Sequence, residues 1–508
     1  MGLNLISSIV VFATQLSISF FLTPFILKNL GNEAFGFLTL ANSIVSYGYI
    51  LTVAINSVAG RFVALEYHKN NIKRANFYFS SVVIVNLFFT LLIAFFSLIF
   101  TINLEYFLNI TDELTIDVKV MFLLYFLNFC LGLFNTIFTI TAFVKNKLYL
   151  LSIRNLISSL IFGLGIVVVF YCLAPRLYYV PVCTLFSTIF IFFSTFYMSK
   201  LIAPDIVFNK SQFSLKMIKN LLNSGIWNSF NALNRVLLTS VDLLICNIFL
   251  NPASMGILAI SKSIILIIES FCATISSIFN PILVEFYAKK DIKNIVKNLK
   301  FYIKIVGFII TTPCVIFVVF GYDFFSLWLW FKTSFEIKEI YILSMISLVP
   351  IIFISYTFVL YNLDSVTNQL KRPAFANFIL GISVVLGQIL VLKFSDFGLL
   401  GIVVLGAILY LCRIVFFDII NAAVNLNLSI FTFYPAIFKN IFVFCILLLV
   451  FIFAKEFISL NSWFDFIFYS FILLVFGYFV NFTLLFSKSE KDIIFSKIIS
   501  KFKKDLNG

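Results

Sequence analysis

The chain has 508 residues, of which 62% are hydrophobic and 11% are charged, and its formal net charge is +14. Soluble proteins are about 45–50% apolar and about 25% charged, and a soluble fold has too little interior to bury so much apolar side chain. The composition therefore excludes a soluble globular protein and predicts a chain whose solvent is mostly lipid.

Apolar runs of about 20 residues, the length that crosses a bilayer, recur along nearly the whole sequence. The fourteen predicted spans are residues 3–27, 36–60, 77–102, 119–143, 150–173, 180–200, 221–249, 254–280, 301–322, 339–361, 374–393, 398–418, 436–454 and 464–486. No basic segment precedes the first run, so we expect a retained span and not a cleaved signal peptide. The predicted fold class is an all-α polytopic membrane protein with about 14 transmembrane helices and no extramembrane domain.

Metal and cofactor chemistry find no support in the sequence. The eight cysteines are scattered singly in or near apolar runs, no CxxC pair occurs, and His68 is the single histidine. Neither a zinc site nor a disulfide framework is indicated by this spacing. We expect no metal and no cofactor.

The distribution of Lys and Arg predicts the orientation of the chain in the membrane. With the N-terminus in the cytoplasm, the cytoplasmic segments hold 27 of the 36 basic residues and the outer segments hold 7. The positive-inside rule then places both termini in the cytoplasm. The net charge is thus mainly a topology signal, with anionic lipid head groups as the expected partner and no role in nucleic acid binding.

An internal repeat divides the chain. Residues 31–73 match residues 251–293 without a gap, with ten identities in 43 positions, and each copy begins at a tight outer corner that contains Gly36 or Gly256. These glycines would let two helices approach closely. Because six spans precede the second copy, we predict a parallel repeat of two six-helix lobes, an arrangement that places a substrate site between the lobes. The predicted domains are an N-lobe at 1–200, a cytoplasmic linker at 201–220, a C-lobe at 221–420, two extra spans at 436–486 and a basic tail at 487–508.

Four charged residues lie inside the predicted seventh and eighth spans. Arg235 and Asp242 are seven residues apart in one span, and Lys262 and Glu269 are seven apart in the next. Such charges are costly in lipid and are usually paired or turned toward a cavity. Matching their depths predicts the pairs Arg235–Glu269 and Asp242–Lys262, which could form either a structural clamp or a charged cavity wall.

The segments FFLTPFILKNLGNEAFGFLTLANSI and RFVALEYHKNN, and their counterparts LNPASMGILAISKSI and FNPILVEFYAKKD, carry a resemblance to a known family. They resemble the Wzx-type polysaccharide or O-antigen flippases of the multidrug/oligosaccharidyl-lipid/polysaccharide (MOP) exporter superfamily. The resemblance implies translocation of an undecaprenyl-diphosphate-linked oligosaccharide from the inner to the outer leaflet by alternating access. It also implies that the two extra spans border a groove for the lipid tail.

A diphosphate-linked glycan needs cations for its phosphates and polar groups for its hydroxyls. Arg235 can hold phosphate with bidentate hydrogen bonds, and Lys262 can add a second cation. The other predicted substrate-binding residues are Asn228, Asn231, Asn234, Arg61, Gln15, Asn42 and Asn56. Asp242 or Glu269 could exchange a proton, and Tyr356, Tyr361 and Asn362 could stack on sugars, although packing is the favoured role for that cluster.

Two other functions remain open at this stage. A multidrug or small-cation antiporter of the same fold would favour an anionic cavity, whereas these spans balance two cations against two anions. A membrane-embedded polysaccharide polymerase or ligase is disfavoured because the outer loops are short and no catalytic motif appears. We therefore expect a transporter and not an enzyme, located in the cytoplasmic membrane, with other polysaccharide-assembly membrane proteins as possible partners.

Overall fold

The computed structural model describes residues 2–145, 147–367 and 369–492. Within these ranges the regular secondary structure is helical, and 13 helices are long and apolar enough to cross a membrane. The predicted all-α polytopic class is therefore confirmed. The difference between 13 helices and 14 predicted spans arises at the N-terminus.

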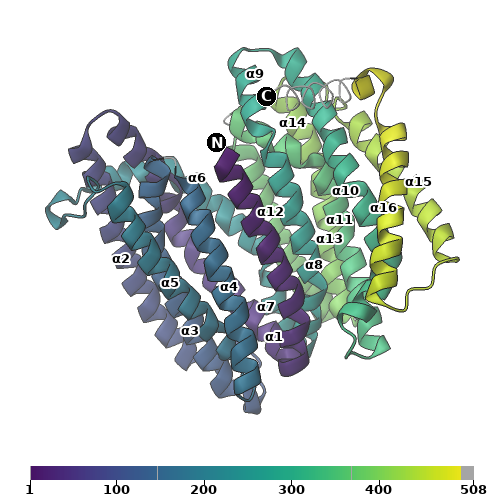
Figure 1. Cartoon of the computed structure of the whole chain (residues 1–508), viewed down its shortest axis with the longest axis horizontal. Helices are drawn as coiled ribbons and strands as arrows, with labels where there is room; N and C mark the ends of the chain where they lie inside the picture. The colour runs from purple at the N-terminus through teal and green to yellow at the C-terminus, as the bar shows by residue number, and fades with distance from the viewer. Residues whose placement is uncertain (1, 146, 368, 493–508) are drawn as a thin grey trace. The chain divides into compact units, whose positions relative to one another are not determined.

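The first helix, α1 (Gly2–His68), contains the first two predicted spans. A straight helix of its 67 residues would be about 100 Å long, over three times the roughly 30 Å of the hydrocarbon layer. The helix is instead broken at Gly31, whose φ of 84° and ψ of 176° are not helical and suit glycine. Figure 1 shows α1 changing direction at this break. The predicted corner thus separates two spans within one long element.

The other spans match single helices or pairs of helices, and most predicted ends lie within a few residues of the observed ones. The elements after α1 are α2 (Ile72–Ile102), η1 (Leu104–Tyr106), η2 (Asp112–Leu114), α3 (Thr115–Val144), α4 (Leu148–Cys172), α5 (Tyr179–Ile202), η3 (Lys210–Gln212), α6 (Leu215–Thr239), α7 (Val241–Phe249), α8 (Pro252–Ser277), α9 (Asn280–Ala288), α10 (Ile292–Trp328), α11 (Ser334–Val366), α12 (Lys371–Phe394), α13 (Gly398–Arg413), η4 (Ile414–Asp418), α14 (Ile419–Asn425), α15 (Tyr434–Lys455) and α16 (Trp463–Leu485).

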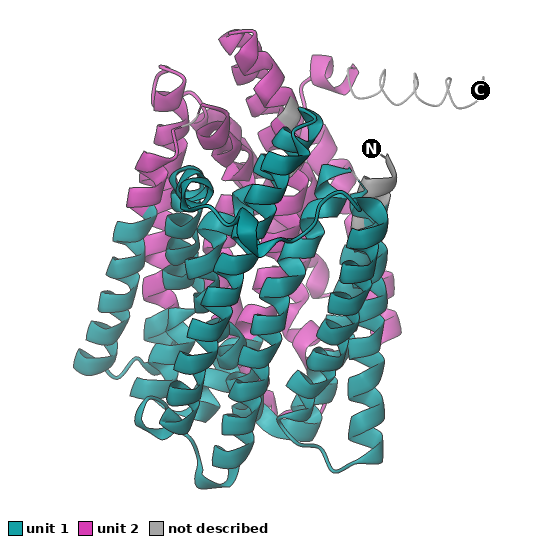
Figure 2. Ribbon diagram, turned by 90° about the vertical axis from the view of Figure 1, so that its left-hand side faces the viewer, with its two compact units in different colours: residues 1–260, 377–402 teal, residues 261–376, 403–508 magenta. Residues whose placement is uncertain are grey.

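The chain forms two compact units, which Figure 2 colours separately. Unit 1 comprises residues 1–260 and 377–402, and unit 2 comprises residues 261–376 and 403–508. Most of α12 belongs to unit 1 because it packs on α6, with Phe378 5.4 Å from Phe230 between ring centroids and Gly381 against Leu237. The lobe boundaries inferred from the repeat stay a prediction.

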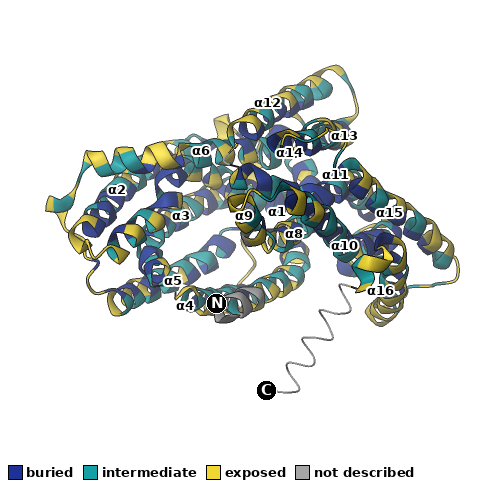
Figure 3. Cartoon of the chain, turned by 90° about the horizontal axis from the view of Figure 1, so that it is seen from above, coloured by how far each residue is buried: buried dark blue, intermediate teal, exposed yellow. Residues whose placement is uncertain are grey.

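Individual helices have one buried side and one exposed side, as Figure 3 shows by colour. On α2, for example, Asn86 is buried, whereas Phe88, Leu91 and Phe95 are exposed. Large apolar side chains on the exposed side suit a lipid solvent, and the polar side chain turns inward. The abundant Phe residues thus serve in part as the lipid-facing surface.

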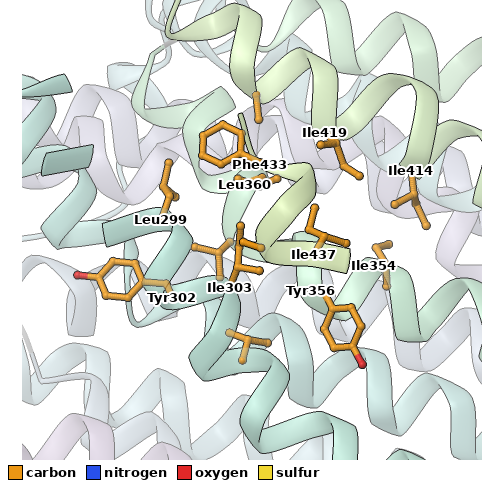
Figure 4. Close-up of a cluster of buried hydrophobic side chains, with 14 of the residues drawn as sticks. Leu299, Tyr302, Ile303, Ile354, Tyr356, Leu360, Ile414, Ile419, Phe433 and Ile437 are labelled. Carbon is orange, nitrogen blue, oxygen red and sulfur yellow. The ribbon is translucent and has the colours of Figure 1, made fainter. Parts of the chain in front are cut away.

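The core of unit 2 is built around α10, α11, α14 and α15. Figure 4 shows Ile303 of α10, Leu360 of α11, Ile419 of α14 and Ile437 of α15 converging in one apolar cluster. Each of these side chains is almost fully buried. This cluster fixes the helices that carry the polar groups described below.

The two extra C-terminal helices are fastened to α10 along its length. Asn481 of α16 donates to the carbonyl oxygen of Phe308 at 3.1 Å, and Tyr478 donates to that of Ile309 at 3.0 Å. Toward the ends, Lys455 contacts Asp323 at 2.9 Å and Lys304 contacts Glu490 at 2.6 Å. We therefore expect α15, α16 and α10 to move together.

The two repeated corners contact each other inside unit 1. A Cβ at Gly36 would lie 2.8 Å from the backbone nitrogen of Gly256, and a Cβ at Gly256 would lie 2.1 Å from the carbonyl oxygen of Asn32. Real side chains do not approach backbone atoms so closely. The two glycines that the repeat places in equivalent positions are therefore required by one shared contact.

We predict that Gly256→Ala lowers the melting temperature of the detergent-purified protein. Overpacking of this kind costs about 1–3 kcal/mol, and the obstructing atom belongs to the backbone of Asn32. Gly132→Ala is the matched control, since a Cβ at Gly132 meets nothing within 4 Å. Equal melting temperatures for the two variants, measured by nanoscale differential scanning fluorimetry, would contradict the prediction.

Candidate functional site

The polar face of α6 is held against the second half of α1 within unit 1. Asn228 donates to the Ser57 hydroxyl at 2.9 Å, and Arg61 donates from Nη2 to the Ser224 hydroxyl at 3.0 Å. The close approach depends on Gly225, because a Cβ there would overlap the carbonyl oxygen of Ala54. Two predicted substrate-binding residues, Asn228 and Arg61, thus lie along one α1–α6 contact.

The remaining predicted polar residues of unit 1 occupy different environments. Asn56 and Asn86 exchange two amide hydrogen bonds of 3.0 and 2.8 Å, so the Asn56 amide joins α1 to α2. Gln15 reaches the Ser159 hydroxyl of α4 at 3.5 Å. Asn234 is almost fully buried, whereas Asn42, Asn231 and Arg235 are exposed.

The charged residues of the predicted seventh span do not share one continuous helix. Arg235 lies in α6, and Asp242 lies in the first turn of α7 after a break at Ser240. A seven-residue spacing fixes a common face only in an unbroken helix, so the spacing alone does not place these two charges on one face. Lys262 and Glu269, by contrast, share the uninterrupted α8.

The structure leaves the two predicted ion pairs untested. Arg235 and Asp242 belong to unit 1, whereas Lys262 and Glu269 belong to unit 2. The pairs Arg235–Glu269 and Asp242–Lys262 therefore stay predictions.

A second polar group, which we call the buried charge cluster, lies within unit 2. Arg413 and Asp418 form an ion pair of 2.9 Å, and their side chains are only 9% and 2% exposed. Tyr361 of α11 donates to the other carboxylate oxygen of Asp418 at 2.9 Å. The members of the cluster are Tyr361, Asp364, Arg413, Asp418, Asn421 and Asn425.

The local backbone explains how Arg413 and Asp418 meet. Residues 414–418 form a short π-helix between α13 and α14. A π-helix makes i→i+5 contacts and often marks a functional site. Side chains five residues apart, which diverge on an α-helix, therefore come together here.

The second carboxylate of the cluster is held by amides. Oδ1 of Asp364 accepts hydrogen bonds from Asn421 at 2.9 Å and from Asn425 at 2.8 Å, and all three side chains are buried. The cluster thus holds two carboxyl groups and one guanidinium. With both carboxylates ionised it carries one excess negative charge, which can be balanced by a cation or by a proton.

Unit 1 contains a buried cation that has neutral acceptors. Arg154 of α4 donates to Asn135 of α3 at 3.2 Å, to Asn155 at 2.7 Å and to Thr195 of α5. Arg154 is one of the 27 basic residues that the predicted topology places in cytoplasmic segments, and in the structure it lies in the helix bundle and is only 5% exposed. It joins three helices of unit 1.

Sequence reasoning also missed the buried charge cluster. Arg413 is another of the 27 basic residues that the predicted topology places in cytoplasmic segments, and Asp418 is the last residue of the span predicted at 398–418. The available signal was RIVFFD, two opposite charges in an otherwise apolar run. Side chains pair on an α-helix at spacings of three or four residues, whereas these two charges are five residues apart. An ion pair between them is therefore expected only where the backbone is a π-helix.

Tyr356 and Asn362 are engaged in the scaffold, as the packing interpretation expects. The fully buried Tyr356 hydroxyl lies 2.9 Å from that of Thr311. Asn362 donates to the carbonyl oxygen of Ser276 at 2.9 Å. These contacts give no support to sugar stacking by Tyr356, Tyr361 and Asn362.

Comparisons with known proteins identify the fold. No protein-family model matches the chain. It is 27% identical over 418 residues to the uncharacterized membrane protein EpsK of Bacillus subtilis strain 168, with 80% of both chains covered. Its structure resembles the lipid II flippase MurJ in an inward closed conformation, with a TM-score of 0.62, 15% identity and coverage of 96% of this chain and 100% of that chain. It also resembles an inward-facing MATE multidrug resistance transporter of the MOP superfamily, with a TM-score of 0.61, 14% identity and coverage of 82% and 99%.

The chain therefore has the fold of MOP-superfamily transporters and flippases. The solved structures that it resembles here are transport proteins and not enzymes. Together with the 13 candidate spans, they identify a multi-pass membrane protein.

We predict that Asp418→Asn strongly destabilises the protein, because it removes the carboxylate that is paired directly with the buried guanidinium of Arg413. Breaking a buried ion pair costs about 3–5 kcal/mol, whereas replacing both partners by apolar residues is often tolerated. The double variant Arg413→Met with Asp418→Leu should thus recover more than half of the lost thermal stability. Glu285→Gln, which breaks an exposed pair with Lys289, is the control and should leave the melting temperature unchanged. A double variant as unstable as Asp418→Asn would refute the pairing argument.

Proposed function

We propose that this chain is a flippase that moves undecaprenyl-diphosphate-linked oligosaccharide from the cytoplasmic to the outer leaflet by alternating access. The observation that carries the proposal is the difference in coverage between the two structural likenesses. The MurJ flippase covers 96% of the chain and the MATE transporter covers 82%. The difference of 14 percentage points is about 70 of the 508 residues, which is enough chain for an added pair of helices such as α15 and α16.

The chemistry of α6 supports an anionic, hydroxyl-rich substrate. Arg235 is exposed on this helix, and a guanidinium is suited to bidentate binding of phosphate. Asn228, Asn231 and Asn234 share the helix and supply amide donors and acceptors for sugar hydroxyls. In this proposal Arg61 and Lys262 provide further positive charge for the diphosphate.

The first helix contributes neutral polar groups in the same proposal. Gln15, Asn42 and Asn56 would bind hydroxyl groups, although Gln15 and Asn56 already make hydrogen bonds within the protein. In an alternating-access cycle these two amides would form hydrogen bonds with the protein in one state and with the ligand in the other. Asp242 and Glu269 would couple transport to an ion or hold the cations in place.

Attachment of α15 and α16 to α10 supports a role for these helices in handling the lipid. Their outer faces expose many large apolar side chains, such as Phe453, Phe468 and Phe479. We propose that this pair borders the path of the undecaprenyl tail. The protein would lie in the cytoplasmic membrane with both termini inside, contact anionic lipids and work with other polysaccharide-assembly membrane proteins.

A multidrug or small-cation antiporter is the second candidate function. It is favoured by the MATE likeness, with a TM-score of 0.61, and by the excess carboxylate of the buried charge cluster. The two structural likenesses reported above give no such support to a polysaccharide polymerase or ligase.

We predict that cells depleted of this protein accumulate lipid-linked oligosaccharide on the cytoplasmic leaflet and lose surface polysaccharide. Arg235→Ala should fail to restore the surface glycan, whereas Arg235→Lys should restore part of it, because lysine keeps the charge but not the bidentate geometry. The leaflet is measured by the accessibility of the glycan to a membrane-impermeant lectin. Arg372→Ala, which removes an exposed charge at the start of α12, is the matched control.

Normal surface glycan in depleted cells, together with increased drug sensitivity, would favour the antiporter. Single repeat units or unligated polymer stranded on the outer face would favour a polymerase or a ligase. Restoration by Arg235→Ala at normal expression would remove Arg235 from the substrate site and leave the flippase itself standing.

A further inference from the structure

A cavity of about 810 Å³ lies beside the loop that joins α2 to α3. Its polar lining comes from Glu105, Asn109, Thr111, Asp112 and Thr115, and Pro252 at the start of α8 also lines it. All of these residues belong to unit 1. The volume falls within the range of about 300–1,000 Å³ that is typical of small-molecule sites.

Hydrogen bonds between Asn109 and the end of α7 hold the wall of the cavity in place. The backbone nitrogen of Asn109 donates to Oδ1 of Asn247 at 2.9 Å, and its side-chain amide donates to the carbonyl oxygens of Asn247 and Ile248 at 2.8 and 3.1 Å. Asn247, which is fully buried, returns a hydrogen bond to the carbonyl oxygen of Asn109 at 3.1 Å. Four hydrogen bonds thus fix the loop to the end of α7.

Two further polar contacts and two buried leucines hold the loop in place. The Thr111 hydroxyl donates to Glu33 beside the α1 break at 2.8 Å, and Lys119 of α3 pairs with Glu105 at 2.7 Å. Leu104 and Leu108 are buried beneath the loop. A preorganised wall lowers the entropic cost of binding, which favours a binding site over a flexible connection.

The charge of the cavity selects among ligands. Glu105 and Asp112 are both carboxylates, and the pairing of Glu105 with Lys119 leaves the lining with a net negative charge. Such a surface repels phosphate and uronic acid groups and accepts hydrogen bonds from hydroxyl and ammonium groups. The lining groups are the carboxylates, amide and hydroxyls that sugar hydroxyls pair with.

We propose that this cavity binds the sugar end of the translocated glycan on the extracytoplasmic side, with preference for neutral or amino-bearing sugars over acidic ones. The assignment rests on the proposed function for its ligand and on the Lys and Arg distribution for its side of the membrane. Carboxylate and hydroxyl groups bind sugar hydroxyls, while the diphosphate is kept away by charge. The cavity is a release site, separate from the Arg235 region.

Binding of defined sugars to the full-length protein in nanodiscs tests the proposal. The probes are chitotriose, which is cationic, triacetylchitotriose, which is neutral, and trigalacturonic acid, which is anionic, measured by isothermal titration calorimetry. We expect chitotriose to bind best and trigalacturonic acid not to bind. Asp112→Asn should weaken chitotriose about tenfold, the loss expected for one charge-assisted hydrogen bond.

Two variants keep the test interpretable. Glu113→Gln removes an exposed carboxylate of η2 that does not line the cavity, and it should bind chitotriose like the wild type. Thr115→Val removes a lining hydroxyl without a change in charge and should weaken triacetylchitotriose while the melting temperature is retained. Equal losses in Asp112→Asn and Glu113→Gln would show that only surface charge is sensed and would overturn the site.

The remaining outcomes separate this inference from the flippase proposal. The sugar site would be overturned, whatever the transport activity, if none of the three probes bound or if trigalacturonic acid bound best. It would also be overturned if Asp112→Asn changed the binding of Ca²⁺ but not the binding of any sugar. Sugar binding by a protein that does not translocate lipid-linked glycan would support the site and overturn the flippase.

Discussion

The structure depends on one constraint, which is that a polar group inside a bilayer must find its partner within the protein. Backbone groups meet it by forming helices, and side chains meet it in pairs such as Asn56 with Asn86 and Arg413 with Asp418. Arg154 meets it with neutral oxygen acceptors instead of a carboxylate. The buried contacts of Arg154 and of Arg413 with Asp418 belong to the scaffold, whereas Arg235, Asn42 and Asn231 are exposed and are the proposed ligand groups.

Hydropathy alone predicted the helices well because it records the same constraint. The span expected at 119–143 is α3 (Thr115–Val144), and the corner expected between the first two spans is the break at Gly31. The break at Ser240 and the π-helix at 414–418 were not predicted. Both are local changes of backbone geometry, to which the average hydropathy of an apolar run is insensitive.

The candidate site was predictable only in part for the same reason. Asn228 was predicted from its place beside Arg235 in the seventh span and Arg61 from its place at the end of the second span, and the structure brings them to one α1–α6 contact. Arg413 was missed because the position of a charge near a predicted span end does not reveal whether it is buried. The sequence predicted that Gly36 and Gly256 each allow two helices to approach closely. That the two glycines contact each other could be seen only in the structure.

The central claim, that the chain translocates a lipid-linked oligosaccharide, is tested most directly with purified protein in liposomes. Undecaprenyl-diphosphate-linked oligosaccharide is placed in both leaflets, and the fraction open to a membrane-impermeant glycosidase is followed with time. The account predicts that protein-containing liposomes expose nearly all of the glycan, whereas protein-free liposomes expose only the outer half. A protein that leaves half of the glycan protected, yet exports a cationic dye when an ion gradient is applied, would contradict the account and identify an antiporter.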